Sequence, residues 1–264
     1  MVDEQRFDTL RVEANGARGQ LVLTRPDQRN ALSRQSLEEL VTAATWFDRR
    51  PQIKVVVVSG EGASFCAGFD LQEFGSPTDA TADGELARDG ADAGRRMAEA
   101  VSGMRALTVA RIHGYCVGGG LVLAAACDLR VAADDAVFFI PEVDLGIPLA
   151  WGGLARLVRE IGPALTKELV LTCRRFGAEE ARSAGLLNRV VPAQGLDDEV
   201  EALATDLAQK PSLALQLTKR YVNALVDQMA STAMSFVDAD LLGAALRDPE
   251  SRAAGRTYLQ GRTG

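Results

Sequence analysis

Apolar residues in the first two thirds of the chain alternate between short β-branched runs and stretches with helical spacing. Residues 10–12 and 20–23 flank Asn15 and Gly16, a dipeptide typical of a hairpin turn, and predict two antiparallel strands. Ser33 can cap the next segment, in which apolar residues recur at i, i+3 and i+4, so a helix is expected there.

The run at residues 53–59, IKVVVVS, is continuously β-branched and is typical of a strand buried on both faces. A strand, a glycine cluster and a helix recur over residues 109–126, and another strand begins at residue 129. Strands that alternate with helices predict an α/β protein with parallel pairing. Residues 75–92, rich in Gly, Ala, Ser and Asp, are expected to form a loop or the start of a helix.

From about residue 197 the apolar pattern predicts helices alone. This change divides the chain into a core at residues 1–196 and a helical segment at residues 197–264. Apolar residues at helical spacing predict that this segment packs on the core or on another subunit. The residues that mark these faces are Leu217, Tyr221, Ala224, Leu225, Leu241, Leu242, Ala245 and Leu246.

Composition narrows the class of protein. The chain has 264 residues, 47% of them apolar, and 29 basic residues against 36 acidic ones give a net charge of −7. This apolar content supports a folded core, and the acidic balance argues against nucleic acid as a partner. Residues 117–127 are the longest apolar run and fall short of the ~20 residues that a membrane helix needs. The N-terminus carries acids where a secretory signal would be apolar, so a soluble, cytoplasmic protein without a membrane partner is expected.

The four cysteines are widely spaced and form no CxxC pair, and the chain has a single histidine. No zinc set of the usual kind can be assembled from these residues, so we expect reduced thiols and no metal.

Three glycine-rich junctions carry candidate chemistry. At residues 65–71, FCAGFDL, Gly68 permits a backbone conformation closed to other residues, and Asp70 can cap a following helix. At residues 118–120, three glycines begin a helix, where free N–H groups and the helix dipole favour an anion. Close packing of the helix would also explain these glycines, and the spacing matches no nucleotide-phosphate motif.

The third junction is PEVDLG at residues 141–146. Burial would raise the pKa of Glu142 and suit it to act as a base near neutral pH. A surface glutamate after a proline is the alternative interpretation.

Taken in order, the motifs AGFD, HGYCVGGG and PEVDLGI, with RNALS near residue 30 and CDLRVAA at residues 127–133, resemble the crotonase superfamily, or enoyl-CoA hydratase/isomerase family. The resemblance implies an α/β spiral of repeated ββα turns with a C-terminal helical segment that forms homotrimers or dimers of trimers. It also implies an acyl-CoA substrate from fatty acid metabolism. No metal or redox cofactor is implied, since CoA arrives as part of the substrate.

The resemblance assigns the backbone N–H groups of Phe69 and Gly119 to the thioester oxygen, where they would stabilise an enolate. It assigns Glu142 to proton transfer. Hydratases of the family use a further glutamate three residues after the middle glycine, where this chain has Val122, which cannot form a hydrogen bond. The water site of a hydratase is therefore expected to be broken.

Two other positions bear on the missing acid. Asp144 is a candidate replacement, but we expect its side chain to point away from Glu142. Ala150 stands where some diene-isomerising relatives carry an acid. One carboxylate suits a double-bond shift, in which Glu142 takes a proton from C2 of a 3-enoyl-CoA and returns it to C4. A hydratase with a compensating residue and a catalytically silent acyl-CoA binding protein are the alternatives.

For the CoA carrier, the resemblance places the segment around Arg29 and Ala31 beside the pantetheine and phosphates. It places the backbone of Ala67, Asp70 and Leu71 beside the adenine and pantetheine. Arg29 is a candidate phosphate partner, although a solvated turn arginine is an equal alternative.

Five further residues have open roles. Lys219 is a weaker candidate for contact with the nucleotide. His113 is expected to be a structural hydrogen-bonding group. Trp151 either lines the acyl pocket or fills core, and Cys66 and Cys116 are expected to be small buried packing residues.

Overall fold

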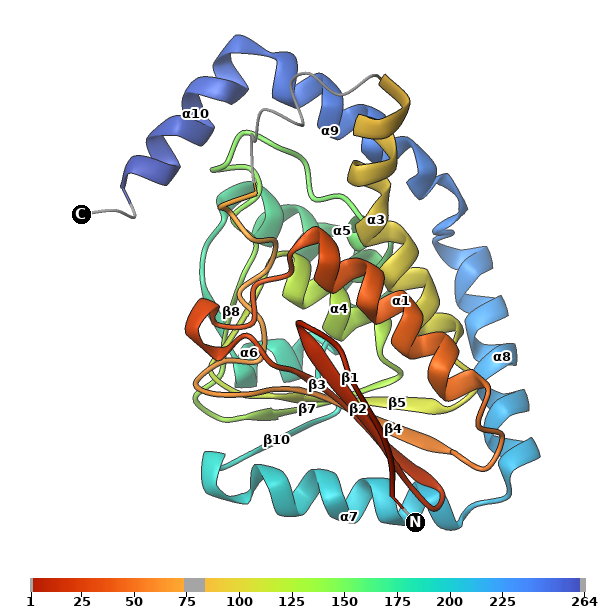
Figure 1. Cartoon of the computed structure of the whole chain (residues 1–264). Coiled ribbons are helices and arrows are strands. Elements are labelled where there is room, and N and C mark those ends of the chain that lie inside the picture. Colours follow the sequence, from red (N-terminus) through yellow and green to blue (C-terminus); the bar gives the residue numbers. More distant parts are fainter. Residues whose placement is uncertain (1, 74–83, 262–264) are drawn as a thin grey trace.

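The computed structural model describes residues 2–73 and 84–261, and a seven-stranded sheet lies at the centre of this part of the chain (Figure 1). The strand order is β1-β2-β3-β4-β5-β7-β10. Its strands are β1 (Asp3–Arg6), β2 (Leu10–Asn15), β3 (Arg18–Leu23), β4 (Val55–Gly60), β5 (Leu107–Ile112), β7 (Leu129–Ala133) and β10 (Arg189–Val191). A smaller sheet has the order β6-β8-β9, with β6 (Tyr115–Val117), β8 (Val137–Phe139) and β9 (Phe176–Gly177).

Helices cover the sheet and make up most of the described part of the C-terminal segment. The α-helices are α1 (Arg34–Asp48), α3 (Gly84–Gly103), α4 (Gly119–Ala126), α5 (Gly153–Thr172), α6 (Ala178–Ser183), α7 (Leu196–Gln209), α8 (Ser212–Met229), α9 (Asp238–Arg247) and α10 (Pro249–Gln260). Short 3-10 turns occur at η1 (Pro26–Gln28), η2 (Ala193–Gly195) and η3 (Ala233–Val237).

The chain repeats one ββα unit. The strand β5 enters the large sheet, β6 enters the small sheet, and α4 follows; β7, β8 and α5 then repeat this order. The pairs β3–β4, β4–β5, β5–β7 and β6–β8 are all parallel. Both the α/β class and the spiral of ββα turns that the sequence predicts are therefore confirmed.

Alternate residues of the central strands feed two separate apolar cores. Val56 and Val58 of β4 belong to a cluster with residues of α1, α3 and α4. Val55 belongs to a second cluster with Leu196 and Val200 of α7, which lies along the other face of the sheet (Figure 1). The three valines are fully buried, so the prediction of a strand covered on both faces is confirmed.

The predicted hairpin and helix cap are also present. The strands β2 and β3 pair antiparallel, with Asn15 opposite Arg18 across the turn. Ser33 caps α1: its side chain accepts from Ser36 N–H, and Ser36 reciprocates toward the backbone of Ser33. This capping box satisfies two helix-end donors and starts α1 where the sequence predicted.

The segment predicted as a loop or helix start is helical from Gly84 onward, and residues 75–83 lie outside the described part of the chain. Packing and ion pairs stabilise this helix. Met97 and Val101 are fully buried in the large core, and Arg95 binds Glu99 at 2.7 Å on the outer face. The apolar period begins after residue 92, so residues 84–92 carry only a weak helix signal in the sequence.

The C-terminal helices expose the apolar faces that the sequence marked. On α8 the only buried residue is Lys219, while Leu217 and Tyr221 are 54% and 69% exposed. The Lys219 ammonium donates to Ala106 O at 2.9 Å and pairs with Asp128 at 2.8 Å. The weaker prediction that Lys219 contacts a nucleotide is therefore wrong, because the ammonium group is buried and Asp128 neutralises its charge.

In the described part of the chain, the structure contains no helix long and apolar enough to cross a membrane.

The buried Lys219–Asp128 pair generates a stability prediction. Lys219→Met leaves the Asp128 carboxylate buried without its counter-charge, so the free energy of unfolding should fall by about 3 to 5 kcal/mol. Urea denaturation followed by circular dichroism measures this loss. Lys210→Met is the matched control, since Lys210 and Asp206 form an exposed pair one turn apart, and its effect should be about 0.5 kcal/mol or less. Equal effects of the two variants would contradict the prediction.

Candidate active site

The first two glycine motifs meet through backbone hydrogen bonds. Cys66 N–H donates to Tyr115 O at 3.0 Å, and Val117 N–H donates to Cys66 O at 3.0 Å. Gly68 then turns with a φ of +89°, and a Cβ there would lie 2.8 Å from Val117 O and 3.4 Å from Gly119 N. Only glycine fits this close approach, which brings residues 68 and 69 beside the start of α4.

Phe69 and Gly119 both present free backbone donors. Within residues 2–73 and 84–261, no acceptor is hydrogen-bonded to either N–H group. Gly119 is the first residue of α4, where the helix dipole adds positive potential. The structure thus places together two residues that the sequence proposed as oxyanion donors; that role stays a prediction.

Glu142 lies in the turn after β8, with its carboxyl group against Gly118. A Cβ at Gly118 would overlap Oε1 of Glu142 and would lie 3.2 Å from its Cδ. The other oxygen, Oε2, is buried and has no hydrogen-bond partner in the described part of the chain. Burial raises the pKa of Glu142 to about 7 and outweighs the opposing effect of a hydrogen bond from its own backbone N–H.

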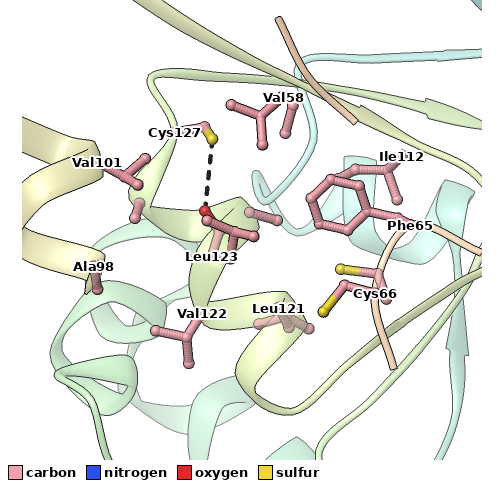
Figure 2. Packing of buried hydrophobic residues seen from close by; sticks show 14 of the residues in the cluster. Val58, Phe65, Cys66, Ala98, Val101, Ile112, Leu121, Val122, Leu123 and Cys127 are labelled. Carbon is pink, nitrogen blue, oxygen red and sulfur yellow. Dashed lines mark hydrogen bonds between the residues drawn. The ribbon is translucent and has the colours of Figure 1, made fainter. Parts of the chain in front are cut away.

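Glu142 has no second carboxylate beside it at the positions that the sequence raised. Val122 is 1% exposed and lies in the apolar cluster with Ala98 and Val101 of α3 (Figure 2). Asp144 is exposed and lies in the same turn, which spans residues 142–146. The carboxyl groups of Glu142 and Asp144 therefore lie in different surroundings.

The last helix rests directly on the turn that carries Glu142. Gly146 has a φ of +74°, and a Cβ there would lie 2.8 Å from the Cα of Ser251 in α10. A Cβ at Gly255 of α10 would lie 2.9 Å from Leu145 O. The two glycines thus allow backbone to approach backbone between the turn and α10.

Trp151 adopts a left-handed backbone conformation, with a φ of 63°. Its indole is half-buried and meets the Phe69 ring edge-on, with the centroids 6.0 Å apart. A Cβ at Gly119 would lie 2.8 Å from its Cη2. The structure therefore places Trp151 against both candidate donor residues. The sequence alone did not decide whether Trp151 lines the acyl pocket or fills core.

The residues proposed for the CoA carrier lie close together. Ala67 N–H donates to Arg29 O at 3.0 Å, and the exposed Arg29 guanidinium lies 5.9 Å from the centre of the Tyr115 ring. Ala31, Ala67 and Leu71 are partly exposed. Their contact with a CoA carrier stays a prediction.

Besides its proposed place beside the CoA carrier, Asp70 has a structural role. It is buried, pairs with Arg25 at 2.7 Å, and accepts Gln72 N–H at 3.0 Å. Arg25 also donates to Ala31 O at 2.6 Å, so one arginine joins two segments proposed for the carrier. Sequence reasoning missed Arg25, since its partner lies 45 residues away and no local pattern links them.

His113 and the cysteines have the structural environments that the sequence predicted. Nε2 of His113 lies 2.8 Å from Gly62 O, and Nδ1 accepts from Arg111 at 2.9 Å, which fits a neutral ring. Burial lowers the pKa of His113. Cys66 and Cys116 are fully buried, and burial raises the pKa of Cys66 to about 12. These thiols are packing residues and not nucleophiles.

The chain matches known proteins over most of its length. A profile of the enoyl-CoA hydratase/isomerase family matches residues 13–263. A probable enoyl-CoA hydratase of Mycobacterium bovis is 36% identical over 230 residues, which cover 87% of each chain. A peroxisomal Δ(3,5)-Δ(2,4)-dienoyl-CoA isomerase of Arabidopsis thaliana is 34% identical, over 83% of this chain and 82% of the relative.

Solved structures agree with these sequence matches. An enoyl-CoA hydratase structure from Geobacillus kaustophilus superposes with a TM-score of 0.77 at 34% identity and covers 97% of each chain. An enoyl-CoA hydratase/isomerase structure from Mycobacterium paratuberculosis gives a TM-score of 0.85 at 26% identity, over 95% of this chain and 100% of the other. The fold and the sequence define a crotonase-type protein. This chain belongs to the enoyl-CoA hydratase/isomerase family, and its relatives include enzymes named for both reactions.

The raised pKa of Glu142 makes the stability of the protein depend on pH. The unfolded chain loses this proton near pH 4.5, while the folded chain keeps it until about pH 7. Stability from Glu142 is therefore full below pH 4.5 and is lost as the pH rises through 7. Relative to Glu142→Gln, the wild type should lose about 3 kcal/mol between pH 4 and pH 8.

Urea denaturation of both proteins across this range measures the difference. Asp144→Asn removes an exposed charge from the same turn and is the control. Parallel stability curves for the wild type and Glu142→Gln would show that the carboxyl group is not desolvated.

Proposed function

We propose that this protein shifts the double bond of an enoyl-CoA, with Glu142 as the base and acid and with the N–H groups of Phe69 and Gly119 as oxyanion donors. The observation that carries the proposal is one buried carboxyl group, with no hydrogen-bond partner on Oε2, set against the glycine segment that begins α4. A pKa of about 7 suits that carboxyl group to take and return a proton near neutral pH.

In the proposed reaction the Glu142 carboxylate removes a proton from C2 of a 3-enoyl-CoA. The electron pair of the broken C–H bond forms a dienolate, whose oxygen accepts hydrogen bonds from Phe69 and Gly119. Protonation of C4 by Glu142 then moves the double bond to C2–C3 and restores the carboxylate. Each donor of this kind is worth about 2.7 to 4 kcal/mol of barrier. The reaction needs neither a metal nor a redox cofactor, because only a proton moves.

Hydration is the second candidate function. The similarity to the Mycobacterium bovis relative, which is named a probable enoyl-CoA hydratase, favours it. The family pattern calls for a second carboxylate at position 122, and the valine here is buried among apolar side chains. Hydration by this chain would therefore need a water held by another group. A silent acyl-CoA binding protein is the third candidate.

We expect the purified protein to convert 3-hexenoyl-CoA into the conjugated 2-enoyl thioester, which is followed by its ultraviolet absorbance. Glu142→Gln should lower kcat by about a thousandfold or more, since proton transfer to or from a positioned group contributes about that much. Asp144→Asn is the matched control and should retain the activity.

The same assay separates the three functions. Rapid loss of conjugated absorbance from 2-hexenoyl-CoA would favour the hydratase. Binding of hexanoyl-CoA in a calorimeter without turnover of either substrate would favour the silent binder.

We further propose that the protein is a homotrimer or a dimer of trimers that binds acyl-CoA through the Arg29–Ala31 and Ala67–Leu71 segments. Support for association comes from large apolar side chains that the C-terminal helices leave exposed. Those on α8 and in the following segment include Leu213, Leu217, Tyr221, Val222, Leu225, Met229, Met234 and Phe236.

A charge on this face should break the assembly. Leu217→Glu and Tyr221→Glu together should shift the sedimentation coefficient from that of an oligomer to that of a monomer, because a carboxylate cannot be buried unpaired. Leu171→Glu on α5 is the control, since Leu171 is 64% exposed but lies outside the C-terminal segment. A wild-type protein that sediments as a monomer would refute the proposal.

A further inference from the structure

Trp151 stands between the two candidate oxyanion donors and the helix α3. Its ring lies edge-on to Phe69 at an interplanar angle of 85°. Its six-membered ring covers the side of Gly119 on which a side chain would stand. A Cβ at Gly94 of α3 would overlap Cδ2 and Cε2 of the same indole. Two glycines on two helices thus leave the space that this one side chain fills.

The backbone of Trp151 is strained, and a residue of another helix holds it in this conformation. A bulky aromatic residue with a positive φ is a rare conformation that persists only where the surroundings impose it. Gly152 also has a positive φ of 69°, and its N–H donates to Asp238 of α9 at 2.8 Å. The carboxylate therefore clamps the turn, and the indole stays against Gly119.

The indole carries no polar contact that would account for its position. Within the described part of the chain, its Nε1 makes no hydrogen bond, and the side chain stays partly accessible. The indole packs against the large apolar core, and Gly94 and Gly119 leave room for it beside the candidate oxyanion donors. This arrangement fixes the shape of the protein surface beside the candidate oxyanion donors.

We infer that Trp151 determines the size of the acyl group and restricts the enzyme to short, unbranched enoyl thioesters. The inference rests on the proposed function, because it needs a thioester oxygen held by Phe69 and Gly119. An oxygen held by these two N–H groups would lie beside two residues that the indole touches, so the first acyl carbons would be placed near this ring. A long or branched chain would compete with the indole for the same volume.

A binding experiment tests the contact without turnover. The chain has two tryptophans, so Trp46→Phe leaves Trp151 as the sole indole. Trp46 lies on α1, edge-on to Phe47 and under Arg50. We expect butanoyl-CoA to change the fluorescence of the Trp46→Phe protein, while free CoA has little effect. Trp151→Phe, which keeps only Trp46, is the matched control and should show no change with either ligand.

A kinetic experiment tests selection. In Trp151→Ala, kcat/KM for a ten-carbon 3-enoyl-CoA should rise relative to a four-carbon one by about tenfold or more, the effect expected for lost pocket contacts of this size. Trp151→Phe should lie between the wild type and Trp151→Ala. An equal change at both chain lengths would overturn the inference and leave Trp151 a structural residue.

The two experiments separate the failure of this inference from that of the proposed function. If acyl-CoA binds and reacts but neither the fluorescence nor the chain-length ratio changes, the inference is wrong and the isomerase stands. If the wild type binds hexanoyl-CoA but not butanoyl-CoA, the inference alone fails. If calorimetry detects binding of neither ligand and 3-hexenoyl-CoA is not converted, the proposed function fails and the inference fails with it.

Discussion

The candidate active site depends on a two-sided exchange of backbone hydrogen bonds around Cys66. Its N–H donates to Tyr115 O, and its carbonyl accepts Val117 N–H, so residues far apart in the sequence run side by side. Gly68 then approaches Val117 as closely as a missing side chain allows. Because main-chain atoms fix this geometry, the free N–H groups that follow need no particular side chain to be held in place.

The molecule gives up stability where it keeps Glu142. Most buried polar groups in proteins have a hydrogen-bond partner, and here Asp70, Asp128 and Asp238 each have one. Oε2 of Glu142 has none in the described part of the chain, and its burial holds the proton to about pH 7. A carboxyl group left in this state is costly to the fold and useful for moving protons.

Local patterns predicted the features that local forces determine. The Asn15-Gly16 turn, the Ser33 cap and the buried strand β4 depend on neighbouring residues and on period, and each was readable from the sequence. The resemblance to a family brought Phe69, Gly119 and Glu142 into one hypothesis before any contact was known.

Contacts between distant segments were not readable. Lys219 lies on α8 among exposed apolar residues, and only the folded structure shows that its ammonium group reaches Asp128. Asp238 meets Gly152 across 86 residues, and Trp151 gains its neighbours from two helices. Such contacts follow from tertiary packing and leave no period or motif in the chain.

The glycine contacts of α10 join this helix to the turn that contains Glu142. The helix rests on the turn through Gly255 and Gly146. Because the two backbones touch there, a side chain at either glycine would push α10 and this turn apart. The seating of the twelve residues of α10 on the turn therefore depends on two positions that carry no side chain.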